Sequence, residues 1–138
     1  MHPIMYPAET DLPKLLAALA PRLLPEEYVF CSLPESRWRE AMDWPALASF
    51  REEEGLSLVL ERPLALRHGF DAVPAMRCIS LGAHSSLAAV GLTAAVAAKL
   101  AEAGISANMI AAFHHDHILV PADRAQDALE ALNELSAE

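Results

Sequence analysis

The segment His114-His115-Asp116-His117 contains the residue types most suited to bind a metal. In an extended strand successive side chains alternate between two faces, so His115 and His117 would point the same way. With His84 nearby, three nitrogen ligands for zinc or iron could be drawn together. If a turn runs through His114–Asp116 instead, Asp116 is a turn-forming residue whose carboxylate accepts hydrogen bonds from backbone N–H groups. The residues alone leave both interpretations open.

A second feature is Ser85-Ser86, which stands just before a run of apolar residues at helical spacing. The first turn of a helix presents unpaired backbone N–H groups and a partial positive charge, which suit a carboxylate. The two hydroxyls could cap the helix or donate to the same anion. Gly91 would let a second backbone approach closely, or it only permits close packing. An anion site and a purely structural role are the two alternatives here.

Other chemistry finds little support in the sequence. It contains no G-x-S-x-G, no P-loop and no G-x-G-x-x-G motif. The run Glu52-Glu53-Glu54 lies beside a turn and is typical of a solvated edge, and we expect Trp38 and Trp44 to serve packing. We therefore expect no catalytic residue and no cofactor, and interpret the chain as a non-enzyme.

The composition narrows the range of partners. The chain has 10 Lys and Arg against 19 Asp and Glu, a net charge of −9. This field repels phosphate backbones and anionic lipid, so we expect neither nucleic acid nor a membrane as partner. Cys31 and Cys78 stand in apolar runs and are interpreted as buried free thiols. With no signal-peptide pattern and no apolar run of membrane-spanning length, the sequence predicts a cytoplasmic location.

The second half of the chain has a clear order of elements. It predicts a strand over Ala75–Gly82, a helix from Ser86 to about Ala103 closed by Gly104, strands over Ile105–Phe113 and His117–Val120, and a final helix from Pro121. With one more strand this is the split βαβ unit of ferredoxin-like α+β folds, βαββαβ, with helices on one face of an antiparallel sheet.

The first half offers a degenerate version of the same order. A helix capped by Thr10 or Asp11 carries leucines at helical spacing and is ended by Pro21 and Pro25. A buried strand follows at Tyr28–Leu33, and then a hairpin of Leu47–Glu53 and Leu56–Leu60 joined by the turn Glu54-Gly55. A short helix at Pro63–His68 is closed by Gly69. We therefore expect two subdomains, 1–69 and 70–138, packed as one body.

The predicted helix from Ser86 to Ala103 is apolar nearly all round, with only Lys99 and Glu102 clearly charged. Its two apolar faces comprise Leu87, Val90, Ala94, Ala97 and Ala101 on one side and Leu92, Val96 and Leu100 on the other. Such a helix needs cover on both sides. One side can rest on its own sheet, and the other requires the first half or a second subunit.

Three segments of the second half, His84–Val96, Gly104–Ile110 and His114–Pro121, resemble the bacterial ACT-domain proteins of unknown function. That family is distantly similar to the ACT regions of aspartate kinases and to the vertebrate cytosolic arginine sensor. In the first half, Tyr28–Leu33 and Phe50–Val59 look like the strand and Glu-Gly hairpin of the same proteins. The resemblance covers most of residues 26–138 and is more specific in the second half.

The resemblance implies a regulatory protein of two tandem ACT-like units. Such domains pair side by side as dimers and bind small metabolites, often amino acids, at the interface between units. The ligand-binding positions that it implies are His84, Ser85, Ser86, Gly91, Leu92, Thr93, Asn108, Met109 and Ile110. In this family the histidine-rich segment lies at a strand-to-strand turn and is not a metal motif. A metal-binding protein or metalloenzyme built on His84, His115 and His117 stays the alternative, and a homodimer that binds an amino acid is the leading interpretation.

Overall fold

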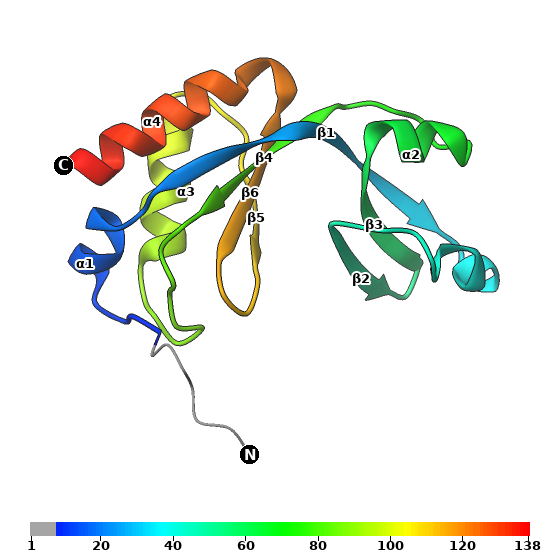
Figure 1. The fold of residues 1–138 in the computed structure, drawn as a ribbon, viewed down its shortest axis with the longest axis horizontal. Helices are drawn as coiled ribbons and strands as arrows, with labels where there is room; N and C mark the ends of the chain where they lie inside the picture. The colour runs from blue at the N-terminus through cyan, green and yellow to red at the C-terminus, as the bar shows by residue number, and fades with distance from the viewer. Residues whose placement is uncertain (1–7) are drawn as a thin grey trace. The chain divides into compact units, whose positions relative to one another are not determined.

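The computed structural model describes residues 8–138, which form two compact units (Figure 1). Among the described residues, one unit contains 8–24 together with Arg77–Glu138, and the other contains Pro25–Met76. Two strands, β1 (Pro21–Leu33) and β4 (Met76–Leu81), pass from one unit into the other. One unit is therefore made of two segments that are far apart in the sequence. The division into sequence halves 1–69 and 70–138 stays a prediction.

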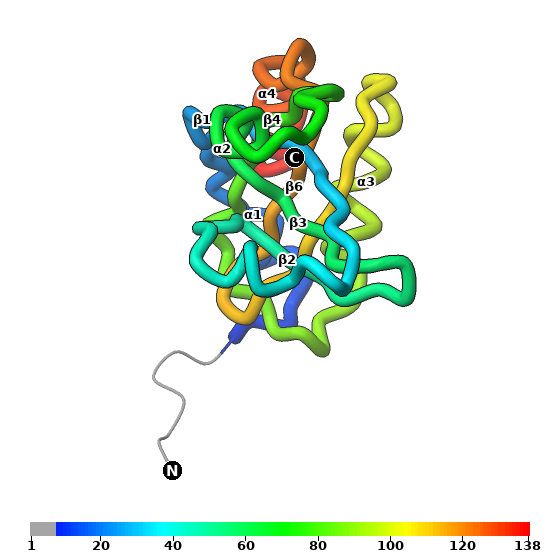
Figure 2. The backbone as a smooth tube through the Cα atoms, turned by 90° about the vertical axis from the view of Figure 1, so that its right-hand side faces the viewer, coloured from blue at the N-terminus to red at the C-terminus, as the bar shows by residue number. Residues whose placement is uncertain are grey.

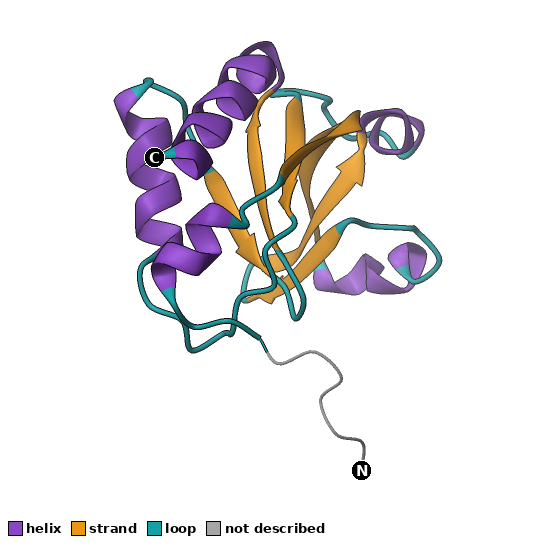
Figure 3. Cartoon of the chain, turned by 60° about the vertical axis from the view of Figure 1, so that its left-hand side comes forward, coloured by secondary structure: helices purple, strands orange, loops and turns teal. Residues whose placement is uncertain are grey.

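The first unit has the predicted order of strand, helix, strand, strand, helix. After β4 come α3 (Leu92–Glu102), β5 (Asn108–Ala111), β6 (Asp116–Pro121), the short 3-10 helix η2 (Ala122–Arg124) and α4 (Ala125–Ala137). The helix α1 (Leu12–Ala17) joins them, and its N-cap Asp11 accepts a hydrogen bond from the Lys14 N–H. Figures 1 and 3 show α1, α3 and α4 on one side of the strands of this unit.

The remaining strand of this unit comes from the start of the chain. Hydrogen bonding orders the strands β2-β3-β1-β4-β6-β5, so the beginning of β1 lies next to β4. The Arg77 guanidinium donates to the Leu24 carbonyl from Nε at 3.0 Å and from Nη2 at 2.6 Å, and the Gly82 N–H donates to Leu19 at 2.9 Å. The order β1-β4-β6-β5 is that of a ferredoxin-like βαββαβ unit whose last strand precedes the others in the sequence. The predicted α+β class with tandem ferredoxin-like units is confirmed.

The core of this unit lies between its sheet and its helices. Ile79 of β4, Ile118 of β6, Leu100 of α3 and Leu132 of α4 are all fully buried in one cluster. Alanines at 125, 128 and 131 form the buried face of α4 together with Leu132 and Leu135, and their small side chains let α4 approach its neighbours closely.

The start of α3 differs from the sequence prediction. We predicted a helix from Ser86, but it begins at Leu92 after Gly91, whose φ of 103° belongs to the left-handed region. The preceding segment is held elsewhere, because Ser85 forms a parallel bridge with Glu9 and the Ser86 N–H donates to the Glu9 carbonyl at 2.9 Å. A right-handed helix cannot pass through a residue with such a φ.

The expected places of Leu87 and Val90 on one face of this helix are wrong for the same reason, whereas cover of its second face by another subunit stays a prediction. Leu87 and Val90 lie in the loop before α3 and are 71% and 83% exposed. Within α3 only Leu92, Val96 and Leu100 are buried, so one face of the helix packs on the core.

Two strands also differ in extent from their predictions. The first was expected over Tyr28–Leu33 but begins at Pro21, and β5 is four residues long where Ile105–Phe113 was expected. Pro21 is tolerated as the first residue of β1, where the missing N–H leaves no ladder bond unmade.

The second unit is built around a three-stranded antiparallel arrangement. β1 pairs with β3 (Gly55–Glu61) from Tyr28↔Glu61 to Leu33↔Leu56, and β2 (Ala48–Glu52) pairs with β3. The predicted hairpin is confirmed, and Figure 2 shows it as the neighbouring runs of tube labelled β2 and β3. The 3-10 helix η1 (Glu35–Ala41) and α2 (Arg62–Arg67) complete the unit, whose core includes Val29, Leu33, Leu58, Leu60 and Ala65.

Among residues 8–138 no helix is long and apolar enough to cross a membrane. Cys31 and Cys78 are both buried and free, as predicted.

We predict that Gly55→Ala destabilises the protein more than Gly104→Ala. Both glycines have positive φ, 147° and 72°, so each alanine strains the backbone by roughly 1–2 kcal/mol. A Cβ at Gly55 would also lie 2.5 Å from the Leu33 carbonyl oxygen, whereas at Gly104 it would meet nothing within 4 Å. Urea denaturation should show the larger loss of unfolding free energy for Gly55→Ala, and equal losses would contradict this account of the hairpin.

Candidate functional site

A small cavity of about 160 Å³ lies at the N-terminal end of α3. Five residues that the sequence predicted for ligand binding line it: Ser85, Ser86, Gly91, Leu92 and Thr93. Leu87, Ala89, Ala111 and Asp116 complete the lining. The loop before α3 and the facing ends of β5 and β6 therefore form one concave site.

The other four predicted residues do not line this cavity. The Asn108 amide donates to the Leu119 carbonyl at 3.3 Å, and Met109 packs against the core of the unit. Ile110 is paired with His117 across β5 and β6, and the His84 ring lies among other histidine rings. The predicted contact of these nine residues with a ligand stays a prediction.

Asp116 is the residue of this cavity that the sequence prediction missed. It is 8% exposed and is the one charged residue among those described that is buried. The Ser85 hydroxyl donates to its Oδ2 at 3.4 Å. Asp116 begins β6, so it shares a face with Ile118 and Val120 and points toward the helices. This alternation was the available signal, but the residue was interpreted as part of a metal-binding segment or as a turn former, not as a ligand-binding residue.

The first turn of α3 supplies the opposite charge. Its first intrahelical bond runs from the Ala95 N–H to the Gly91 carbonyl at 2.9 Å, and no side chain caps the helix. The N–H groups of Leu92 and Thr93 precede that bond and have no intrahelical acceptor. The Ser86 hydroxyl accepts from the Ala88 N–H at 3.0 Å, so it stabilises the loop rather than the helix start. The expected helix cap at Ser85-Ser86 is wrong.

The cavity therefore presents partial positive charge from the helix terminus and negative charge from Asp116. A helix terminus favours carboxylates and phosphates, and a buried carboxylate favours an ammonium group. A zwitterion of the size of an amino acid complements both.

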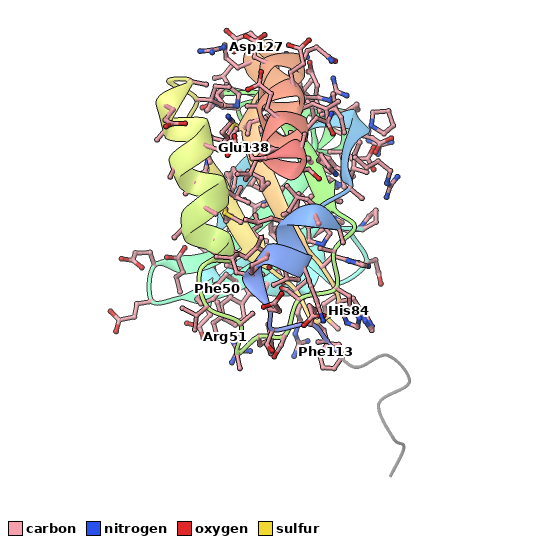
Figure 4. All side chains as sticks on the ribbon, turned by 90° about the vertical axis from the view of Figure 1, so that its left-hand side faces the viewer. Phe50, Arg51, His84, Phe113, Asp127 and Glu138 are labelled. Atoms are coloured by element: carbon pink, nitrogen blue, oxygen red, sulfur yellow. The ribbon has the colours of Figure 1, made fainter. Side chains whose placement is uncertain are left out.

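The histidines divide into two groups. The His84 ring centroid lies 5.4 Å from that of His114 and 5.9 Å from that of His115. Phe113 contacts His114 edge-on at 5.0 Å, and Figure 4 shows the labelled His84 and Phe113 near each other. The His117 ring makes a different contact, with its Nδ1 2.7 Å from the Ser80 hydroxyl. No group of three or more His, Cys, Asp or Glu within the described chain is placed to hold a metal. The structure thus gives the set His84, His115 and His117 no support as metal ligands.

The environment of His117 disfavours its charged form. Burial lowers the pKa of His117 below its ordinary value, and the charge of His115 lowers it further, while Asp116 acts in the opposite direction. The neutral imidazole is therefore the stable form in the folded protein near neutral pH.

The fold and the sequence together define a family. One ACT-domain model matches residues 7–77, and a second ACT-domain model matches residues 72–134. The chain belongs to the ACT-domain family. A search of curated protein sequences gave no match.

Solved structures agree with this assignment. A protein of unknown function from Vibrio cholerae, described as a possible transport protein, is 46% identical, with a TM-score of 0.81. The match covers 91% of this chain and 95% of that one. The regulatory subunit of aspartate kinase from Thermus flavus is similar in fold, with 11% identity, a TM-score of 0.63, and coverage of 86% and 98%. Aspartokinase III of E. coli, solved with aspartate and ADP, has 17% identity, a TM-score of 0.57, and coverage of 87% of this chain and 33% of its own. The resemblance to ACT-domain proteins of unknown function and to aspartate kinase regulatory regions is confirmed.

We predict that His117 takes up its proton below pH 6.5 in the folded protein. A lowered folded-state pKa means that the unfolded chain binds the proton first, so this group lowers stability as the pH falls through 6.5 and below. NMR titration of the imidazole signals should show this midpoint, with the His117 signal assigned by its loss in His117→Gln. A His117 midpoint above 6.5 would contradict the proposed effect of burial.

Proposed function

We propose that this protein is a regulatory ACT protein that binds an amino acid or a similar zwitterionic metabolite at the N-terminal end of α3. The observation that carries the proposal is the pair of opposite charges in one cavity. The uncapped N–H groups of Leu92 and Thr93 suit a carboxylate, and the buried Asp116 suits an ammonium group. The ligand-binding set of this cavity consists of the five predicted residues that line it, with Asp116 added.

The proposed role is binding rather than catalysis. The matched family models are ACT domains and cover most of the chain. The residues that line the cavity do not include a nucleophile and a base with a third group to orient the base, as nucleophilic catalysis requires. Ligand binding would shift the arrangement of ACT units and so signal to a partner. The proposed location is the cytoplasm, where reduced buried thiols such as Cys31 and Cys78 are the norm.

The cavity also favours a homodimer. Its volume of about 160 Å³ is below the roughly 300–1,000 Å³ typical of small-molecule sites. Leu87 and Val90 stand on the loop that forms its rim and are largely exposed. A second copy packed on this loop would bury both side chains and enclose the ligand, as expected for a site between ACT units.

We predict that a single amino acid raises the melting temperature of the purified protein in a concentration-dependent way. A ligand at free concentration L that binds only the folded state stabilises it by RT ln(1 + L/Kd), so the shift grows with the logarithm of ligand concentration once that exceeds Kd. A thermal-shift screen of the common amino acids at millimolar concentration tests this. The absence of a shift with every compound would contradict an amino-acid sensor.

We predict that Asp116→Asn weakens binding of the amino acid that the screen identifies, measured as the dissociation constant of each variant. Asp116→Asn keeps the shape of the side chain but removes its charge, and the loss of a charge-assisted hydrogen bond of about 1.5–3 kcal/mol weakens binding roughly 10- to 150-fold. Asp127→Asn is the matched control, because Asp127 is exposed and pairs with Arg124 at 3.0 Å on the surface. Equal affinity of Asp116→Asn and the wild type would place the ligand elsewhere.

We predict that the protein sediments as a dimer and that Leu87→Asp with Val90→Asp produces monomers. A charged carboxylate at each exposed apolar position opposes burial against a second copy. Sedimentation velocity measures the change, and circular dichroism verifies that the fold is kept. The control is Ala94→Asp with Ala98→Asp, which introduces the same two charges at exposed positions of α3. A wild-type monomer at all concentrations would contradict the dimer.

A further inference from the structure

A second and larger cavity, of about 350 Å³, lies in the same unit as the first but shares no lining residue with it. Its lining consists of Ala20, Arg22, Ser80, Leu81, Gly82, His115 and His117. Ser80 and His117 alternate along β4 and β6 with Ile79 and Ile118, which pack under the helices. The two polar side chains therefore belong to the opposite face of the sheet.

The rings of His115 and His117 each supply an N–H hydrogen-bond donor in or beside this cavity. His115 Nδ1 lies 3.3 Å from the Ala83 carbonyl, which can only accept, so this nitrogen carries the hydrogen. When the Ser80 hydroxyl donates to His117 Nδ1, the proton of the neutral His117 ring is on Nε2. The lining includes no carboxylate, although the whole chain carries a net charge of −9.

Arg22 supplies a full positive charge to this cavity. Within residues 8–138 it has no ion-pair partner. Burial raises the pKa of the nearby Cys78 thiol, and the Ser80 hydroxyl and the Arg22 charge partly oppose that rise. Arg22 and Ser80 thus act on the same face of β4, and the guanidinium is free to pair with an anion.

One wall of the cavity is held in an unusual backbone conformation. Ala20 has a φ of 43°, the one positive value at a non-glycine position in the described chain. The Gly82 N–H donates to both the Leu19 and Ala20 carbonyls, at 2.9 and 3.1 Å. A Cβ at Gly82 would lie 2.9 Å from the Ala20 Cβ, so glycine is needed for this approach. Strained backbone is kept where surrounding contacts fix it, often at ligand sites.

We propose that this cavity is a second ligand site, which binds the oxyanion group of a small metabolite through Arg22 and His117, with the Ser80 hydroxyl orienting the His117 ring. The guanidinium pairs with the anion, and the His117 N–H donates to a second oxygen. The volume leaves room for an organic body beside the anion, because it lies within the range typical of small-molecule sites. The site is independent of the cavity at α3, so the two proposals succeed or fail separately.

Inorganic phosphate and acetate are the probes, titrated separately into the full-length protein at constant ionic strength adjusted with chloride. The affinity is measured by amide chemical shifts in NMR spectra. We expect saturable shifts at Arg22, Ser80 and His117 with at least one probe. Saturation by phosphate alone identifies a phosphorylated metabolite, by acetate alone a carboxylic acid, and by both a general oxyanion site, and each of these supports the proposal.

The variants Arg22→Gln and Arg124→Gln make a matched pair. Arg22 is exposed and unpaired, so its substitution should leave the fold intact and weaken binding at least about tenfold. Arg124 pairs with Asp127 on the surface of the same unit, and its substitution should leave binding unchanged. Equal affinity of Arg22→Gln and the wild type would overturn the proposal. So would shifts confined to Ser86–Thr93, or shifts that do not saturate with either probe.

Discussion

The structure of the first unit depends on the hydrogen bonds that hold the beginning of β1 beside β4. The Arg77 guanidinium binds the Leu24 carbonyl, and the Gly82 N–H binds Leu19 and Ala20. These contacts fix the strand that completes the sheet and place α1 against α3 and α4. Without the residues before Leu24, the unit would lack one strand and one covering helix.

The same end of the chain shapes the candidate site. Because Glu9 pairs with Ser85 and accepts from the Ser86 N–H, the residues before Gly91 are held in a loop. The helix then begins at Leu92 with uncapped N–H groups beside a cavity. A helix that began at Ser86 would have placed its positive end elsewhere and left Asp116 without this counterpart. The chemistry of the cavity therefore arises from a contact between residues far apart in sequence.

The elements that depend on local patterns were predictable from the sequence. Alternating apolar residues and a glycine with positive φ gave the β2–β3 hairpin, and the 3.6-residue period with Gly104 gave the end of α3. The start of α3 was not predictable, because Ser85-Ser86 is a common helix-start pattern and only Glu9 holds it in another conformation. Pro21 and Pro25 correctly predicted the end of the first helix, which stops at Ala17, but not the long strand that begins at Pro21 and continues past Pro25. The burial of Asp116 was not predictable, because the residue at which β6 starts decides on which face of the sheet its side chain lies.

Because β1 and β4 each have residues in both units, the two units complete their native contacts at different times during synthesis. Pro25–Met76 is a continuous segment, so all of its partners have been made once Met76 has left the ribosome. The first unit must wait, because α1 packs against α4, which ends at Ala137. The residues of α1, although translated before Pro25–Met76, thus complete their native contacts after that segment does. Until then Leu15 of α1 and Leu19 just after it lack the cover that α4 gives them.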